Sequence, residues 1–276
     1  IPLLDQPRAR EVAILFPAEM SLYEPLEVDA GGRHRMDLLG WYQQFTDLGW
    51  HVDIVHPDQV AAGVLKEYKH LVIPHNSLYD LEDNIALENA VKKFTEAGGT
   101  VFHGPHCKLA ERAFGIVEET IAFDCIRWQE EVIPHGWSTV AFAGGTPLGK
   151  YIQTGKNAMV QTDVGKGGVF SFGFQYGYAY SRRTMPIVPA QYGKREMHPV
   201  VLLKQTPVAA LAGCSPLLPI APIKGVEFAR FGSKLVIVNH RSSPVDISGI
   251  KARQFVPMVP FASKWLAAHS AVAFTF

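Results

Sequence analysis

The first hundred residues alternate short apolar runs with longer amphipathic stretches. The run "EVAILF" at 11–16 has the length and composition of a buried strand. The stretch "HRMDLLGWYQQFTDLG" at 34–49 places Leu38, Tyr42 and Phe45 at helical intervals and stops at a glycine, as helices often do. One strand followed by one helix is therefore predicted at the start of the chain.

The same alternation continues to residue 104. Further strand-length runs occur at 51–57, 70–75 and 100–104, and an amphipathic helix is predicted over 81–99. The order strand-helix-strand-strand-helix-strand, with short links, is typical of the α/β class. It predicts a doubly wound, mostly parallel sheet.

The chain beyond about residue 125 has a different pattern. Strand-length runs separated by Gly, Pro and Ser predict mostly β structure, with a hairpin loop at "VGKGG" (164–168) and a last strand at "AVAFTF" (271–276). The Pro-rich segment 215–225 has the composition of a semi-rigid connector. We place the domain boundary just before it, which gives an α/β domain over 1–213 and a small antiparallel β-sandwich over 214–276.

Composition narrows the classes of function. The chain has 47% hydrophobic and 19% charged residues with a formal net charge of zero, which disfavours nucleic acid as a partner. No apolar run reaches the roughly 20 residues that a membrane span needs. The three cysteines are odd in number and form no CxxC pair, which disfavours a disulfide framework and favours a reducing, cytoplasmic location.

Polar residues follow the carboxyl ends of the predicted strands, where doubly wound sheets bind their ligands. We predict that six of them line this crevice: Glu19, His56, His75, Asn76, His103 and His106. Imidazole and carboxylate groups are possible ligands for zinc or another divalent metal. None of these histidines has the i, i+4 spacing that fixes two ligands on one helix. We therefore assign no metal and no cofactor, and favour a polar pocket or a packed surface.

Several segments, taken in order, resemble one known family. The strand at 11–16, "YKHLVIPHNSLYDLED" at 68–83 and "VKKFTEAGGTVFHGP" at 91–105 resemble the trimerisation domain of family 42 β-galactosidases. "GKNAMVQTDVGKGGVFSFGF" at 155–174 is similar to a hairpin late in that domain, and "GVEFARFGSKLVIVNHRSSPVDI" at 225–247 is similar to the family's C-terminal β-domain. The resemblance implies a flavodoxin-like fold, that of class I glutamine amidotransferases.

The resemblance also implies a function. This chain would be a non-catalytic oligomerisation or scaffold portion of a β-galactosidase-like glycoside hydrolase. It would form a homo-oligomer, such as a trimer, beside a (β/α)8 catalytic barrel, with a β-galactoside or related carbohydrate near the interface. A barrel takes about 250 residues, and nearly all of this chain is assigned to other domains. No residue here is therefore assigned a catalytic role.

The alternative is a stand-alone amidotransferase-like or metal-dependent hydrolase that uses the strand-end histidines. In amidotransferases a strand runs into a strained elbow whose apex cysteine is the nucleophile. In "GGTVFHGPHCKLAE" (98–111) that apex falls at His103 or Gly104, and Cys107 follows about one helical turn too late. We interpret Cys107 as a small buried hydrophobic side chain.

Aromatic residues alternate with small ones from Phe170 to Tyr180. This spacing predicts one aromatic row on a strand face. Core packing is the first interpretation, with a carbohydrate platform or a subunit interface as alternatives.

Overall fold

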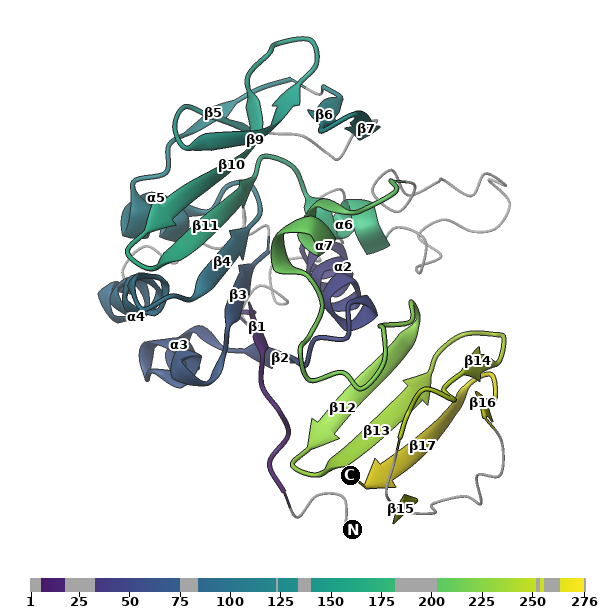
Figure 1. Cartoon of the computed structure of the whole chain (residues 1–276). Coiled ribbons are helices and arrows are strands. Elements are labelled where there is room, and N and C mark those ends of the chain that lie inside the picture. Colours follow the sequence, from purple (N-terminus) through teal and green to yellow (C-terminus); the bar gives the residue numbers. More distant parts are fainter. Residues whose placement is uncertain are drawn as a thin grey trace. The chain divides into compact units, whose positions relative to one another are not determined.

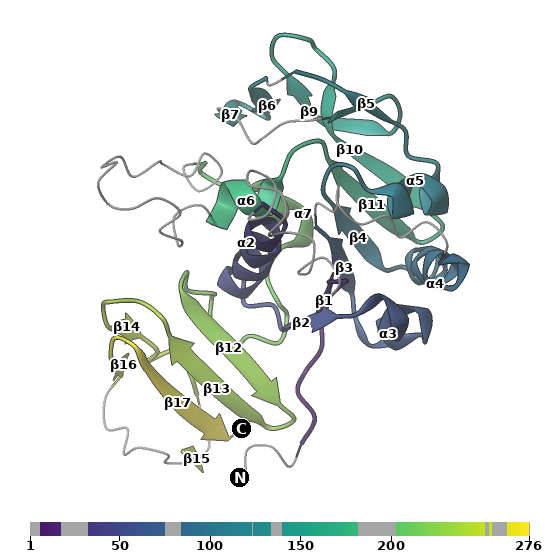
Figure 2. The same ribbon diagram turned by 180° about the vertical axis from the view of Figure 1, so that it is seen from behind.

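The computed structural model describes residues 6–17, 33–74, 84–122, 124–133, 140–181, 203–251, 254–255 and 264–275. The chain divides into two compact units, whose elements Figures 1 and 2 show from opposite sides. The larger unit comprises residues 12–43 and 53–207, and the smaller one comprises 1–11, 44–52 and 208–276. The predicted domain ranges, 1–213 and 214–276, assign residues 1–11, 44–52 and 208–213 differently and stay a prediction.

The larger unit is built on a sheet whose central strands are parallel (Figure 1). These strands are β1 (Val12–Leu15), β3 (His70–Ile73), β4 (Thr100–His103) and β11 (Gly167–Phe172), and β2 (Val52–Val55) lies beside β1. The spatial order β2-β1-β3-β4-β11 is that of a doubly wound, flavodoxin-like sheet. The fold class and the four strands predicted before residue 105 are therefore confirmed.

The helices among the described residues are α2 (Arg33–Asp47), α3 (Pro57–Ala61), the 3₁₀ helix η2 (Val64–Glu67), α4 (Ile85–Glu96), α5 (Lys108–Phe114), α6 (Tyr176–Ser181) and α7 (Pro207–Ala212). Helices α2 and α4 are the two that the amphipathic pattern predicts. Helix α3 was not predicted, because the apolar run was extended through Pro57. The strand ends two residues earlier, since proline fits the first turn of a helix and His56 caps that helix.

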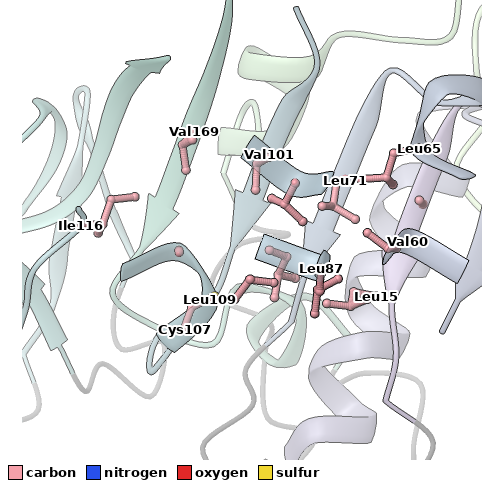
Figure 3. Packing of buried hydrophobic residues seen from close by; sticks show 14 of the residues in the cluster. Leu15, Val60, Leu65, Leu71, Leu87, Val101, Cys107, Leu109, Ile116 and Val169 are labelled. Carbon is pink, nitrogen blue, oxygen red and sulfur yellow. The ribbon is translucent and has the colours of Figure 1, made fainter. Parts of the chain in front are cut away.

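One face of the parallel sheet packs against α3, α4 and α5. Alternate strand residues point to this face, and they form one core with the helices (Figure 3). Its members include Leu15, Leu71, Val101 and Val169 from the strands, and Val60, Leu87 and Leu109 from the helices.

The other face carries an aromatic cluster. The ring centroid of Trp41 lies 6.2 Å from that of Phe102, 5.4 Å from that of Phe172 and 4.7 Å from that of Tyr176. The prediction of one aromatic row over 170–180 is wrong, because β11 ends at Phe172 and Tyr176 begins helix α6. Core packing is nevertheless the role of these rings, since all four are fully buried.

Two glycines allow helix α6 to pack closely against α2. A Cβ atom at Gly40 of α2 would overlap the carbonyl of Gly177 in α6, and one at Gly177 would overlap the backbone of Asp37. The buried Asp37 carboxylate also accepts the Tyr178 N–H at 3.0 Å. Glycine thus permits backbone contact between α2 and α6 that any side chain would prevent.

An antiparallel extension continues the sheet beyond β11. Its strands are β5 (Glu118–Thr120), β6 (Ile126–Trp128), β7 (Glu131–Ile133), β8 (Val140–Phe142), β9 (Thr146–Tyr151) and β10 (Asn157–Val164). Strands β10 and β11 form a hairpin whose loop is Gly165 and Lys166, so the hairpin predicted at "VGKGG" is confirmed. Gly165 has φ +60°, which favours glycine at this turn.

The smaller unit is a pair of antiparallel sheets. One contains β12 (Val226–Phe231), β13 (Lys234–Asn239), β17 (Ser270–Thr275) and β15 (Gln254–Phe255), and the other pairs β14 (Val245–Asp246) with β16 (Trp265–Leu266). Phe228, Ile237 and Phe274 pack with Val245 and Leu266 in one core. The small β-sandwich and its last strand are thus confirmed.

No helix in the part of the chain that the structure describes has the length and apolarity to span a bilayer.

Candidate functional site

The turn from β4 to α5 occupies the place of the predicted elbow, and His103 closes the strand before it. The ring is fully buried, with Nδ1 2.8 Å from the Gly104 carbonyl oxygen and Nε2 2.7 Å from the Ser171 hydroxyl. Because a carbonyl only accepts, Nδ1 carries the proton and Nε2 accepts from the hydroxyl. Burial lowers the pKa of His103 to about 4. His103 is therefore a neutral, fully bonded side chain at pH 7.

The strained residue of the turn is His106. Its φ is +59°, in the left-handed region that non-glycine residues rarely adopt. The elbow prediction, which placed the apex at His103 or Gly104, is thus wrong by two or three residues. The reason is the link Gly104-Pro105-His106, which lets the strand end normally and places the sharp bend next to the helix.

Glu118 of β5 holds this turn. Its carboxylate accepts the backbone N–H of His106 at 2.9 Å and that of Cys107 at 3.2 Å. Burial raises the pKa of Glu118, while these two hydrogen bonds and Lys108 oppose the rise. The sequence pair Glu118-Glu119 suggests a solvated face, and that interpretation is wrong for Glu118. Successive strand residues point to opposite sides, so only Glu119 faces solvent, where it pairs with Lys156.

Cys107 cannot serve as a nucleophile at neutral pH. Its thiol is buried in the core shown in Figure 3. Burial, together with the nearby Glu118 carboxylate, raises the pKa of the thiol to about 12. The thiolate is the reactive form, so the interpretation of Cys107 as a small buried hydrophobic side chain is confirmed.

His56 forms hydrogen bonds within the first turn of helix α3. It is the N-cap of α3: Nδ1 accepts the Asp58 N–H at 3.4 Å, and the His56 N–H donates to the Gln59 side chain at 2.8 Å. This reciprocal pair is a capping box, which satisfies otherwise unpaired amides at a helix start.

The remaining predicted residues, Glu19, His75 and Asn76, lie outside the described residues. The crevice-lining role of the six therefore stays a prediction. Among the residues that the structure does describe, no three His, Cys, Asp or Glu side chains are grouped so as to hold a metal ion.

A buried polar cluster in the smaller unit was missed by sequence reasoning. His51 Nδ1 lies 2.6 Å from Glu11 Oε2, and the Ser215 hydroxyl donates to the same oxygen at 2.7 Å. Burial acts to raise the pKa of Glu11, but these hydrogen bonds outweigh it and lower the pKa. Both partners use one carboxylate oxygen, with the acid in the middle, so the arrangement is not that of a nucleophilic triad. It links three segments distant in sequence, and no local pattern predicts it.

An exposed row of side chains crosses the antiparallel extension. The pairing register places Val132 opposite Arg127, and Arg127 opposite Lys150. Like charges directly opposite one another on a sheet are destabilising. Neither cation forms an ion pair within the described part of the chain. Val132 and Ile152 are each 42% exposed beside them. We call Arg127, Val132, Lys150 and Ile152 the extension patch.

Comparisons with known protein families match one part of this chain. Residues 10–121 match the family described as the β-galactosidase trimerisation domain. No curated protein sequence matches the chain.

Solved β-galactosidase structures share the fold over nearly the whole chain. The enzyme from Bacillus circulans sp. alkalophilus is 14% identical, with a TM-score of 0.64 over 98% of this chain and 42% of its own. The cold-adapted enzyme from Rahnella sp. R3 is 16% identical, with a TM-score of 0.62 over 100% of this chain and 42% of its own. The enzyme from Halorubrum lacusprofundi is 15% identical, with a TM-score of 0.61 over 99% of this chain and 40% of its own. The chain thus spans about two fifths of the length of these structures.

Proposed function

We propose, from the membership of residues 10–121 in the β-galactosidase trimerisation domain family, that this chain is the oligomerisation portion of a β-galactosidase-like glycoside hydrolase. The family match is the observation that carries the proposal. In this proposal the chain forms a homo-oligomer, a trimer by the family's description, and accompanies a (β/α)8 catalytic barrel. The β-galactoside or related carbohydrate binds near their interface.

The chemistry of the β4–α5 turn supports a non-catalytic role. A hydrolase or amidotransferase working at this turn needs an accessible nucleophile or base. Cys107 is protonated and buried, and His103 is enclosed by two hydrogen bonds. The described residues form a doubly wound sheet and a β-sandwich, and no (β/α)8 barrel. The stand-alone hydrolase alternative therefore gains no support from these groups.

The extension patch is the surface that we assign to assembly. Exposed aliphatic side chains beside unpaired cations fit an interface that buries apolar area and receives carboxylates from a second copy of the chain. Two carboxylates of the antiparallel extension are already engaged: Glu119 pairs with Lys156, and Glu131 accepts the Lys204 N–H at 3.0 Å. The charges of Arg127 and Lys150 are therefore left for a partner.

We also propose a cytoplasmic location. All three cysteines are free, and Cys214 is exposed. Exposed free thiols persist in reducing compartments and are disfavoured in oxidising ones.

The test is the assembly state of the purified chain. Sedimentation equilibrium should give a mass above that of the 30.5 kDa monomer, rising with protein concentration. The double variant Arg127→Glu/Lys150→Glu should shift the chain to monomer, because it reverses the charge that meets the partner. Lys92→Glu, an exposed cation on α4, is the matched control and should leave assembly unchanged. A monomer at every concentration would contradict self-assembly through this chain, and hydrolysis of a chromogenic galactoside by it would contradict the non-catalytic role.

A further inference from the structure

A groove opens at the amino-terminal ends of the parallel strands, at the opposite end of the sheet from the β4–α5 turn. Its floor includes His70 and Thr100, the first residues of β3 and β4. Helices α3, η2 and α4 supply its walls. The groove has a volume of about 890 Å³, which lies within the range of small-molecule sites.

The charged side chains that line this groove are all of one sign. Lys66, Lys69 and Lys93 line it together with His70, and no Asp, Glu or Arg is among its described lining residues. Lys66 and Lys93 form no ion pair within the described part of the chain. A cleft lined by one sign of charge concentrates counter-ions. The groove is therefore suited to an anion.

A further cation borders the groove. Lys166, in the β10–β11 hairpin loop, is exposed and forms no ion pair with a described residue. Its Cβ would lie 3.9 Å from a Cβ placed on Gly98, which lines the groove. The loop is held there by the Lys166 N–H, which donates to the Glu96 carbonyl at 3.1 Å. The carboxylates of Glu67 and Glu96 belong to the wall elements but lie outside the lining set.

The charge count points to a dianion. A carboxylate carries one negative charge, whereas a phosphate monoester carries about −1.5 to −2 at pH 7 and three acceptor oxygens. Lys66 and Lys93, which form no ion pair among the described residues, supply two positive charges, and these match the phosphate better than the carboxylate. Lysine binds phosphate as a point charge without the planar geometry that arginine imposes on carboxylates.

The uncharged part of the groove lining suits a ligand that carries hydroxyl groups. Asn89 and Thr100 offer an amide and a hydroxyl, and Gly98 and Gly99 offer bare backbone. A Cβ on Gly99 would overlap the ring of Phe94, so the ring lies directly over this backbone. Phe94 is half-buried, which leaves part of its apolar ring on the groove. Sugars combine such polar edges with an apolar face.

We propose that this groove binds a phosphorylated sugar, with the phosphate held by Lys66 and Lys93 and the sugar resting between Phe94 and the Gly98–Thr100 backbone. This site is separate from the extension patch, and the proposal does not depend on the assembly state.

The test is a titration of the ¹⁵N-labelled chain followed by amide chemical shifts. Glucose 6-phosphate, galactose 1-phosphate, glucose and inorganic phosphate are added in separate titrations. At least one sugar phosphate should change the amide chemical shifts of Gly98, Gly99 and Thr100 saturably and bind more tightly than inorganic phosphate. Glucose should leave these chemical shifts unchanged. Raising the salt concentration should weaken binding, because the lysines are exposed.

Variants separate this site from general charge attraction. Lys93→Ala should weaken binding by about tenfold through loss of one charge-assisted contact. Lys92→Ala removes an equal charge from the neighbouring position of α4, which does not line the groove, and should leave binding unchanged. Equal weakening by both, equal affinity for inorganic phosphate, or no shift with either sugar phosphate in a folded chain would each overturn the proposal.

Discussion

The two ends of the parallel strands hold polar side chains in opposite situations. At the carboxyl end, His103 and Glu118 are withdrawn from solvent, and their polar atoms bond to the turn and to β11. At the amino end, Lys66 and Lys93 are exposed, line a groove and form no ion pair among the described residues. The carboxyl end is where doubly wound sheets bind their ligands. In this chain His103 and Glu118, at that end, bond to groups of the fold itself.

The difference gives an experimental criterion. A polar residue with a structural role stabilises the fold, so its removal lowers the free energy of unfolding. A polar residue placed for a ligand contributes little to stability in the ligand's absence and can oppose it. Replacing residues at each end should therefore move stability in different directions.

The largest effect is expected for His103→Ala. The change leaves a cavity and removes the partners of the Ser171 hydroxyl and the Gly104 carbonyl. We expect the free energy of unfolding to fall by about 3 kcal/mol. Urea denaturation followed by tryptophan fluorescence measures it, with Ser171→Ala as the smaller matched change. A loss below about 1 kcal/mol would show that His103 is not part of the packed core.

His103 should also make stability depend on pH. Its pKa is lowered to about 4 in the folded chain, against about 6.5 in the unfolded chain. Between pH 4 and pH 6.5 the unfolded chain therefore binds more protons than the folded chain. The contribution of His103 to the free energy of unfolding is complete above pH 6.5 and is lost as the pH falls to 4. The loss is about 3 kcal/mol by linkage.

Carboxylates also titrate in this acid range, so their effect on stability must be separated from that of His103. The pKa of Glu118 is raised, which acts in the opposite direction, and that of Glu11 is lowered, which acts in the same direction. The measured quantity is therefore the difference between the wild-type chain and His103→Gln. If the two chains lose stability in parallel between pH 7 and pH 4.5, the ring is not held neutral by burial.

A smaller effect is expected for Glu118→Gln. The amide keeps one acceptor oxygen, so one of the two N–H groups at His106 and Cys107 loses its partner. We expect a loss of about 1–2 kcal/mol in the free energy of unfolding, measured by urea denaturation. Glu119→Gln is the control, because that exposed side chain pairs only with Lys156 at the surface. An equal loss in both variants would mean that Glu118 does not hold the turn.

Sequence patterns predicted the parallel strands well because their apolar runs are buried on both faces. The runs at β1, β3 and β4 have lengths typical of strands, and short links leave little choice of topology. The end of the aromatic run was not predictable in the same way. Its turn into α6 depends on the approach of Gly177 to Gly40, 137 positions earlier in the chain, which no local period contains.

The candidate site was harder to predict than the fold. The sequence identified His103 and His106 as notable but not what they bond, because their partners Ser171 and Glu118 lie on other strands. The sequence does not predict a role for the groove lysines, since isolated lysines are ordinary surface residues. Only the fold brings them together at the amino-terminal ends of the parallel strands.

The smallest expected effect is on the amino end, where Lys93→Gln should leave the free energy of unfolding within about 0.5 kcal/mol of the wild-type value or raise it slightly. The substitution removes one of several like charges around the groove and breaks no ion pair among the described residues. Comparing urea midpoints in low salt and in 0.5 M salt checks the cause, because salt should erase any gain that comes from reduced repulsion.

Lys108→Gln is the contrasting control, since Lys108 pairs with Glu111 at 2.8 Å and its loss should lower stability slightly. A clear destabilisation by Lys93→Gln in both salt conditions would mean that this lysine, like His103, serves the fold, and the contrast between the two ends of the sheet would be lost.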